Sequence, residues 1–345
     1  MLPISEVPTP ALLLDLELFE KNLGRMAARA RECGKNLRPH AKAHKCPEIA
    51  RRQTGAGACG ICVATVAEAE VMARAGITDM LLTSPLGEPA KAIRAAQTGA
   101  MVVVDHPCQV AWYASSKRPI DVLVDLDVGD HRTGARSVGQ ALEIAREIDR
   151  APNLRLRGLQ AYSVSGSHAG PRGRRKNSEA TFAKAAEARD AFKRSGFSTE
   201  ILSGGSTGTW EVDLTLAGLT EFQAGSYALM DLAYRRLGID FANALTVLAT
   251  VISANHRGFA TVDAGYKAFS TDRPFPPEPV NLPGAKYRFA GDEFGIVEQD
   301  GLRAGDRIEF LPPHVDPTVN LYDRIYVRRG ERIEDVWPIM DRARC

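Results

Sequence analysis

Short apolar runs alternate with helical patterns from residue 37 to about residue 228. The stretches between the runs are Ala-rich and amphipathic at 66–75, 88–98, 137–150 and 177–195. Short apolar runs separated by helical stretches predict parallel strands joined by crossover helices. Eight such units are what a (β/α)8 TIM barrel needs, so we predict an α/β barrel. The expected strands are 37–42, 60–65, 79–84, 100–106, 120–128, 155–162, 200–205 and 219–227.

The pattern changes after residue 240, where helical periodicity fades and β-like runs such as 246–254 appear. Residues 323–339 have the pattern of two strands joined at Arg329-Gly330, which is a hairpin signal. The opening run at 9–16 is also strand-like and can pair with this C-terminal region. We therefore expect a mostly β domain beside the barrel. The predicted limits are 17–238 for the barrel, and 1–16 with 239–345 for the β domain.

Composition narrows the function classes. The chain has 345 residues, of which 44% are hydrophobic and 25% charged, as in soluble globular proteins with a large core. A net charge of +2 gives no reason to expect a nucleic-acid or membrane partner. We see no signal peptide and no apolar run near the ~18 residues of a membrane helix. Six cysteines without framework spacing favour a reducing cytoplasm.

Catalytic residues of a barrel sit at the C-terminal ends of its strands and in the loops that follow. Lys42 is the sharpest candidate, because it ends the first expected strand and shares a face with His40. If that face points into the barrel, burial favours the neutral amine that a Schiff-base lysine needs. A lysine that reaches solvent from a strand end is the more ordinary interpretation. The same rule selects Thr65, Ser84, Arg132, Tyr162, the 204–208 loop and 225–227.

The SGGSTG segment at 203–208 follows the seventh expected strand and precedes a short helix. Glycines let backbone N–H groups approach an anion, and barrels often bind phosphate after strands seven and eight. Ordinary turn chemistry is the alternative, since Gly and Ser form turns. The next loop adds Gly225, Ser226 and Tyr227. A lysine at strand one with a phosphate cup at strands seven and eight suggests a phosphorylated aldehyde cofactor.

His314 and Asp316 lie two residues apart just before a β-like run. On an extended segment their side chains would point the same way. Imidazole and carboxylate are workable ligands for a divalent ion that prefers nitrogen and oxygen. His-x-Asp also occurs by chance, so the spacing alone is a weak signal.

Six motifs, taken together, resemble one known family. In their order and separation the chain resembles the D-threonine aldolase and D-serine dehydratase-like family, fold type III pyridoxal-phosphate enzymes related in fold to alanine racemase. The resemblance spans about residues 7 to 338. The motifs are RPHAKAHK (38–45), DVGDHRTG (127–134), SGGSTG (203–208), AGSY (224–227), DAG (263–265) and HVDPT (314–318).

The resemblance implies roles for individual residues. Lys42 would bind pyridoxal 5'-phosphate covalently, Arg132 would lie near the phenolic oxygen of the cofactor, and Tyr162 near its ring. His314 and Asp316 would be the metal ligands. The phosphate pocket would be lined by Gly204, Gly205, Ser206, Thr207, Gly225, Ser226 and Tyr227.

The chain also departs from the family pattern. Residues 63–65 read Val-Ala-Thr where aldolases often have Cys-Gln-Lys, and Ser167-His168 replaces a usual Gln-His pair. His168 remains the candidate general base, with a metal-bound water as the alternative.

The resemblance leads to an expected reaction. We expect a metal-dependent aldolase that cleaves small D-3-hydroxy amino acids, such as D-threonine, to glycine and an aldehyde. Dehydratases of the family tend to show His-x-Cys with zinc, and a thiolate favours zinc. This chain has Asp316 instead, and a carboxylate with an imidazole suits manganese or magnesium more readily. Dehydration of D-serine or 3-hydroxy-D-aspartate is the first alternative. A racemase and a non-catalytic cofactor carrier are further alternatives. A homodimer is implied by the resemblance alone.

Overall fold

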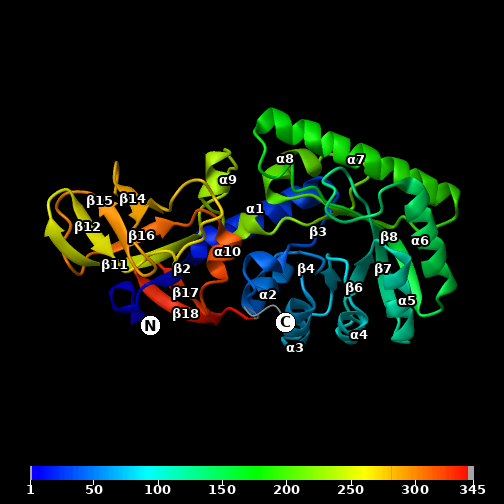
Figure 1. Ribbon diagram of the computed structural model, residues 1–345, viewed down its shortest axis with the longest axis horizontal. Coiled ribbons are helices and arrows are strands. Elements are labelled where there is room, and N and C mark those ends of the chain that lie inside the picture. The colour runs from blue at the N-terminus through cyan, green and yellow to red at the C-terminus, as the bar shows by residue number, and fades with distance from the viewer. Residues whose placement is uncertain (1, 281, 341–345) are drawn as a thin grey trace. The chain divides into compact units, whose positions relative to one another are not determined.

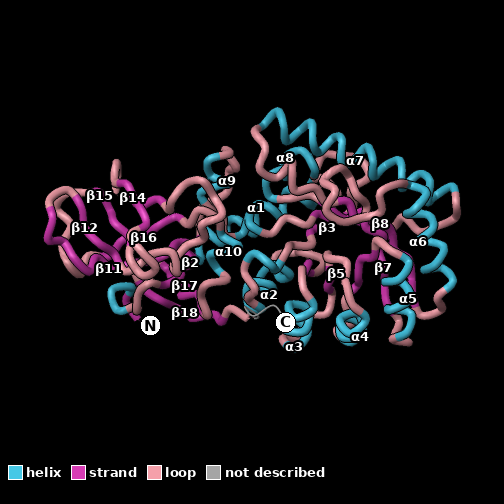
Figure 2. Tube along the Cα trace, in the orientation of Figure 1, coloured by secondary structure: helices cyan, strands magenta, loops and turns pink. Residues whose placement is uncertain are grey.

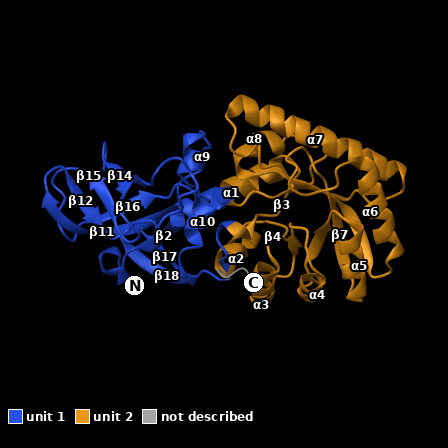
Figure 3. Ribbon diagram, viewed as in Figure 1, with its two compact units in different colours: residues 1–24, 43–46, 226–342 blue, residues 25–42, 47–225, 343–345 orange. Residues whose placement is uncertain are grey.

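The computed structural model describes residues 2–280 and 282–340. The chain forms two compact units (Figure 3). Within the described residues, one takes in 25–42 and 47–225, and the other takes in 2–24, 43–46, 226–280 and 282–340. Compact units are not the same as domains, so the predicted domain limits stay a prediction.

The first unit is built on an eight-stranded parallel sheet with the order β3-β10-β9-β8-β7-β6-β5-β4 (Figure 1). A parallel bridge between His40 and Cys62 joins the two ends of this order, and Cys62 N donates to Pro39 O over 2.8 Å. The predicted (β/α)8 barrel is thus confirmed. The strands are β3 (Asn36–Leu37), β4 (Ile61–Val63), β5 (Met80–Leu82), β6 (Met101–Val104), β7 (Ile120–Asp125), β8 (Leu154–Ala161), β9 (Ile201–Gly204) and β10 (Glu221–Phe222).

Helices follow the barrel strands, and their first residues explain where they start. Thr65 and Ser137 are N-caps whose hydroxyls accept from the backbone N–H groups of Glu68 and Gln140. The long helix Pro171–Arg194 begins six residues before its predicted start at 177, because Pro171 suits the first helical position. The helices are α1 (Leu16–Glu32), α2 (Pro47–Gly55), α3 (Val66–Arg74), α4 (Pro89–Gln97), α5 (Pro107–Ser115), α6 (Val138–Arg150), α7 (Pro171–Arg194) and α8 (Trp210–Asp213).

The first and last barrel strands are shorter than predicted. The expected strand 37–42 ends at Leu37, and Ala41–Ala43 is a 3-10 turn, η2. Pro39 has no N–H to give to a ladder, and Lys42 N donates instead to His40 Nδ1 over 3.3 Å. The predicted alternation of His40 and Lys42 along one strand is therefore wrong, because this backbone turns.

The second unit is built on a ten-stranded sheet that is largely antiparallel; its strands, like those of the barrel, are magenta in Figure 2. Its main order is β1-β18-β17-β2-β11-β12-β15-β14, with β16 paired to β11 and β13. The predicted hairpin at Arg329-Gly330 is confirmed as β17 and β18, and the opening run pairs here as expected. The strands are β1 (Leu2–Pro3), β2 (Ala11–Asp15), β11 (Leu245–His256), β12 (Phe259–Val262), β13 (Glu278–Pro279), β14 (Lys286–Phe289), β15 (Gly295–Glu298), β16 (Arg307–Leu311), β17 (Arg324–Arg329) and β18 (Arg332–Pro338).

Short helical segments complete the second unit, namely η1 (Ile4–Glu6), η4 (Ser226–Ala228), α9 (Leu232–Arg236) and α10 (Val315–Val319). Each unit has an apolar core. Cys62, Leu81, Val103 and Leu123 belong to one core cluster on the barrel strands and are fully buried, and Leu13 is fully buried in the β unit. Across residues 2–280 and 282–340, none of the helices combines the length and the apolar character that a membrane crossing requires.

Candidate active site

Lys42 lies in η2, five residues beyond the end of β3 at Leu37, and is half-buried. The buried His40 ring fixes the backbone before it. His40 Nδ1 accepts from Lys42 N, so Nε2 carries the proton and donates to Thr83 Oγ1 over 3.1 Å. Thr83 Oγ1 in turn donates to Val63 O over 3.2 Å. This chain of bonds ties the lysine backbone to two neighbouring strands.

The predicted phosphate loop follows β9 and leads into a 3-10 turn, η3 (Thr207–Thr209), for which Ser206 is the N-cap. Gly205 has φ +82, a left-handed conformation that favours glycine. A Cβ at Gly204 would overlap Ala161 O, and one at Gly208 would overlap Ser167 O. Glycine is therefore required here by close backbone packing, and the loop lies at the same end of the barrel as Lys42.

Asp213 supports this loop through a hydrogen bond and was not predicted. Its carboxylate accepts from Thr209 Oγ1, which lies 2.8 Å from Ser206 Oγ. Because Thr209 has a single hydroxyl proton and gives it to Asp213, Ser206 donates to Thr209. Burial raises the pKa of Asp213 to about 6. A lone aspartate carries no spacing signal, so sequence reasoning could not find it.

Arg132 and Tyr162 meet after the neighbouring strands β7 and β8, where the Arg132 guanidinium lies 5.2 Å from the centre of the Tyr162 ring. The 127–134 loop is anchored beside Arg132, since Thr133 Oγ1 donates to Asp125 Oδ2 over 2.8 Å. Gln160 Nε2 donates to the other oxygen of Asp125 over 2.9 Å. Burial raises the pKa of Asp125 to about 6.

His168 is half-buried in the loop that joins β8 to α7. This loop packs against the glycine loop, because Gly208 approaches the Ser167 carbonyl and Arg174 Nη1 donates to Gly208 O over 3.1 Å. The predicted general base thus belongs to the same end of the barrel as the predicted phosphate loop.

The third predicted segment, Gly225 to Tyr227, follows β10. A Cβ at Gly225 would lie 2.5 Å from His40 O, so this position accepts only glycine. Tyr227 is fully buried in the β unit, where its ring packs on Phe241 at 5.7 Å. Ser226 Oγ donates to Asp316 Oδ2 over 3.1 Å.

The candidate metal residues are close together, but not in the predicted geometry. His314 is the N-cap of α10 and Asp316 lies in its first turn, so the segment is extended only at His314. His314 Nε2 lies 3.9 Å from Asp316 Oδ2. The buried Asp231, which was not predicted, accepts from Val315 N over 2.9 Å and so holds the start of α10.

The donors at His314 and Asp316 suit a divalent cation that prefers nitrogen and oxygen. Among the described residues, His, Cys, Asp and Glu nowhere gather in a group of three or more that could hold a metal ion. A cation held here would therefore have two protein ligands and take its remaining ligands from water or substrate.

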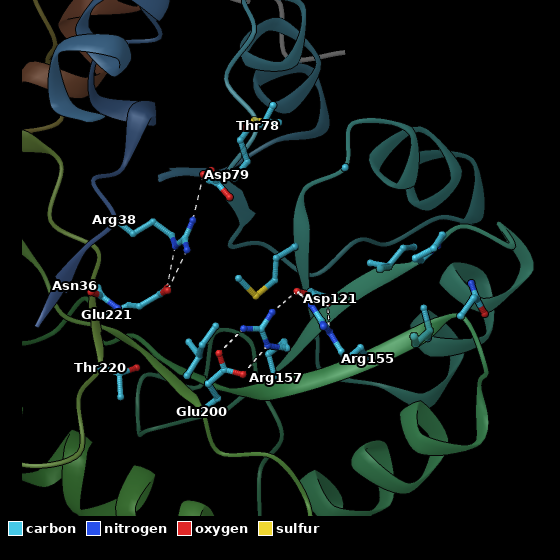
Figure 4. Close-up of a pocket in the computed structure, with 18 of the residues that line it drawn as sticks. Asn36, Arg38, Thr78, Asp79, Asp121, Arg155, Arg157, Glu200, Thr220 and Glu221 are labelled. Atoms are coloured by element: carbon cyan, nitrogen blue, oxygen red, sulfur yellow. Dashed lines mark hydrogen bonds and ion pairs between the residues drawn. The ribbon is translucent and has the colours of Figure 1, made fainter. Parts of the chain in front are cut away.

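A cavity of about 670 Å³ opens at the opposite, N-terminal end of the barrel strands (Figure 4). Most of its charged side chains form ion pairs with one another. Arg157 pairs with Asp121 and Glu200, and buried Arg38 forms a two-bond ion pair with Glu221. Ion pairs at this end of a barrel tie strands together, whereas catalysis is carried at the other end. We therefore assign these pairs to stability.

Comparison with known proteins gives the family. Residues 14–233 match the model of the alanine racemase N-terminal domain, and residues 244–328 match a putative serine dehydratase domain. A D-threonine aldolase from Arthrobacter sp. is 38% identical, covering 99% of this chain and 94% of its own. A 3-hydroxy-D-aspartate aldolase from Paracoccus denitrificans (strain Pd 1222) is 36% identical, covering 99% and 93%.

A solved structure extends the likeness to the whole fold. The D-threonine aldolase from Filomicrobium marinum superposes with a TM-score of 0.95 at 35% identity, covering 99% of this chain and 97% of its own. The chain therefore belongs to the D-threonine aldolase and D-serine dehydratase-like family of fold type III pyridoxal-phosphate enzymes.

Proposed function

We propose that this protein is a lyase that uses pyridoxal 5'-phosphate and a divalent metal to cleave D-3-hydroxy amino acids, such as D-threonine, to glycine and an aldehyde. The pair of His314 and Asp316 carries the proposal, because an imidazole and a carboxylate 3.9 Å apart suit a hard or borderline cation. The similarity to named aldolases over nearly the whole chain supports the same reaction.

The barrel residues fit the cofactor. Lys42 offers an amine at a strand end, the glycine loop offers close backbone approach, and Arg132 offers a cation for the phenolic oxygen. When bound, the cofactor ring accepts the electron pair released at the α carbon, and the cation polarises the β-hydroxyl. Gly204, Gly205, Ser206, Thr207, Gly225, Ser226 and Tyr227 are the proposed phosphate residues.

Ser206 has a specific role in this proposal. Its hydroxyl proton goes to Thr209 and onward to Asp213, so the side chain shapes the loop. The phosphate would then be held mainly by backbone N–H groups, as glycine loops at helix starts commonly do.

His168 is the proposed base that removes the proton of the β-hydroxyl. Loss of this proton lets the Cα–Cβ bond break, so that the β carbon leaves as an aldehyde and the α carbon takes up a proton to give glycine. Imidazole is suited to this task because its ordinary pKa lies near neutrality. Tyr162 would hold Arg132 in place by the contact of its ring with the guanidinium.

Dehydration is the second candidate, favoured by the match of residues 244–328 to a putative serine dehydratase domain. In that reaction the α proton is removed and the β-hydroxyl leaves as water, and hydrolysis of the resulting imine by water gives a keto acid and ammonia. Asp316 argues against it, since we expect a thiolate at this position in zinc-dependent dehydratases.

The deciding experiment is product identification. Purified protein with pyridoxal phosphate and Mn²⁺ is incubated separately with D-threonine and D-serine. Glycine and acetaldehyde from D-threonine, absent with the Lys42→Ala variant, are the expected result. A keto acid with ammonia from either substrate would establish the dehydratase. No turnover of either substrate would contradict both candidates for these substrates.

Four further features belong to the proposal. Manganese or magnesium is the proposed cation, with zinc as a further option. The proposed location is the cytoplasm, which agrees with five described cysteines that form no disulfide. The proposed assembly is a homodimer, by resemblance to the family. The proposed partner is the small amino-acid substrate, without nucleic acid or membrane.

A further inference from the structure

The imidazole of His314 has a carboxylate partner that lies outside the HVDPT motif. Its Nδ1 is 2.7 Å from Oδ2 of Asp272, a residue on the loop after β12. The other ring nitrogen, Nε2, lies 3.9 Å from Asp316 Oδ2. The two nitrogens of one ring therefore face two different carboxylates, of which only one belongs to the proposed metal site.

The shorter contact decides which nitrogen carries the proton. A carboxylate can only accept, so Nδ1 must donate its hydrogen to Asp272. The competing contact is Arg273 Nη2, which lies 3.4 Å from the same nitrogen and would require Nδ1 to accept. A charge-assisted bond of 2.7 Å outweighs a marginal contact of 3.4 Å. With the proton on Nδ1, the lone pair of Nε2 is directed to the side of Asp316.

The loop that carries Asp272 is fastened to the segment that carries His314. Ser270 Oγ donates to His314 O over 3.1 Å, and Ser270 N donates to Thr318 Oγ1 over 3.1 Å. Thr318 Oγ1 in turn donates to His314 O over 2.7 Å. Ser270 and Thr318 are both buried, so these bonds are shielded from water. They fasten the loop, two residues before Asp272, to the segment that carries the imidazole.

The carboxylate of Asp316 is oriented by partners other than those of His314. Ser226 Oγ donates to Asp316 Oδ2 over 3.1 Å, while Asp231 anchors α10 through Val315 N. Asp272 thus completes an arrangement in which each proposed ligand has a hydrogen-bonding partner of its own. Carboxylates that accept from the second nitrogen of a metal-bound histidine fix its tautomer and its ring orientation.

We infer that Asp272 is a positioning residue of the metal site, which selects the tautomer of His314 that binds the cation through Nε2. This inference rests on the proposed function, because it concerns the same cation. Asp272 does not itself bind the cation. Its side chain is 45% exposed, so its replacement by asparagine should leave the fold intact.

The test measures Mn²⁺ affinity directly on the cofactor-loaded protein, from the electron paramagnetic resonance signal of unbound Mn²⁺. Asp272→Asn should raise the dissociation constant about 10-fold to 100-fold, as losses of such partners do. An amide can donate as well as accept, so the tautomer is no longer selected. Asp272→Glu should recover part of the affinity. Asp323→Asn, which removes an exposed carboxylate paired with Arg324, is the matched control and should change nothing.

A second measurement separates positioning from simple loss of charge. Nitrogen-15 shifts of the histidine ring in metal-free protein should show the Nδ1–H tautomer at His314 in the wild type and a mixture in Asp272→Asn. Unchanged Mn²⁺ affinity, or an unchanged tautomer, in Asp272→Asn would overturn the inference alone. A wild type that binds no Mn²⁺ would overturn the metal part of the proposed function, and the inference with it.

Discussion

Glu221→Gln should strongly destabilise the barrel. Glu221 begins β10 and forms a two-bond ion pair with Arg38, with Nε to Oε2 at 2.9 Å and Nη2 to Oε1 at 3.0 Å (Figure 4). The two side chains are only 5% and 9% exposed. Burial lowers the pKa of Arg38, but the hydrogen bond and the charge of Glu221 outweigh it and raise the pKa overall. The guanidinium stays charged when its partner is replaced, because an arginine side chain keeps its proton in proteins.

The size of the effect follows from that buried charge. Removing one partner of a buried ion pair costs about 3–5 kcal/mol, because the remaining charge has lost both water and counter-ion. Arg38 Nη1 keeps one bond, to Asp79 O at 3.1 Å, which places the expected loss near the lower end of this range. Replacing both residues, as Arg38→Met with Glu221→Leu, removes the charge as well and should cost less than Glu221→Gln alone.

The assay is urea unfolding followed by far-ultraviolet circular dichroism, for the wild type, both single variants and the double variant. Cofactor affinity should not change, since the pair lies at the N-terminal end of the strands. A loss below about 1 kcal/mol for Glu221→Gln would refute the reasoning, because that is the range of a solvent-exposed pair. A double variant less stable than the single one would refute it too.

Three further outcomes are expected. Lys42→Ala should abolish the imine absorbance of added pyridoxal phosphate while circular dichroism stays unchanged; a retained imine band would remove Lys42 from its proposed role. Burial raises the pKa of Asp125 to about 6, above the ordinary value of about 3.9, so its contribution to stability is present at low pH and is lost as the pH rises through about 6. In Asp125→Asn, the free energy of unfolding should depend less on pH between about pH 4 and pH 6. The same pH dependence as in the wild type, measured by urea unfolding at several pH values, would contradict the burial argument. Gly225→Ala should lower stability by about 1–3 kcal/mol, because its Cβ would lie 2.5 Å from His40 O; an unchanged melting temperature would contradict this packing.

The sequence predicted the barrel because burial determines where apolar residues occur in strands and helices. This pattern of apolar residues can be read directly in the sequence. It overestimated strand lengths at 37–42 and 219–227, since buried residues continue beyond the ends of β3 and β10, where only isolated backbone pairing remains. Proline at position 39 was the one visible sign of the earlier end.

Side-chain geometry at the candidate site was less predictable than the fold. The spacing of His314 and Asp316 identified the pair, but their closeness depends on α10, whose start is held by Asp231, 84 positions before Val315 in the chain. Asp213 and Asp272 are single aspartates without a local pattern. Such partners are determined by tertiary contacts, so no spacing pattern in the sequence marks them.

The strand β2 has a consequence for synthesis of the chain on the ribosome. It occupies an interior position of its sheet, antiparallel to β11 and parallel to β17, so residues 11–15 have their strand partners at residues 245–248 and 325–328. At about 5–20 residues per second, these apolar residues emerge well before either partner exists. The apolar β2 segment therefore spends this interval without its sheet, and early aggregation should concentrate there. Nascent chains that stop before β11 should be the ones that recruit chaperones.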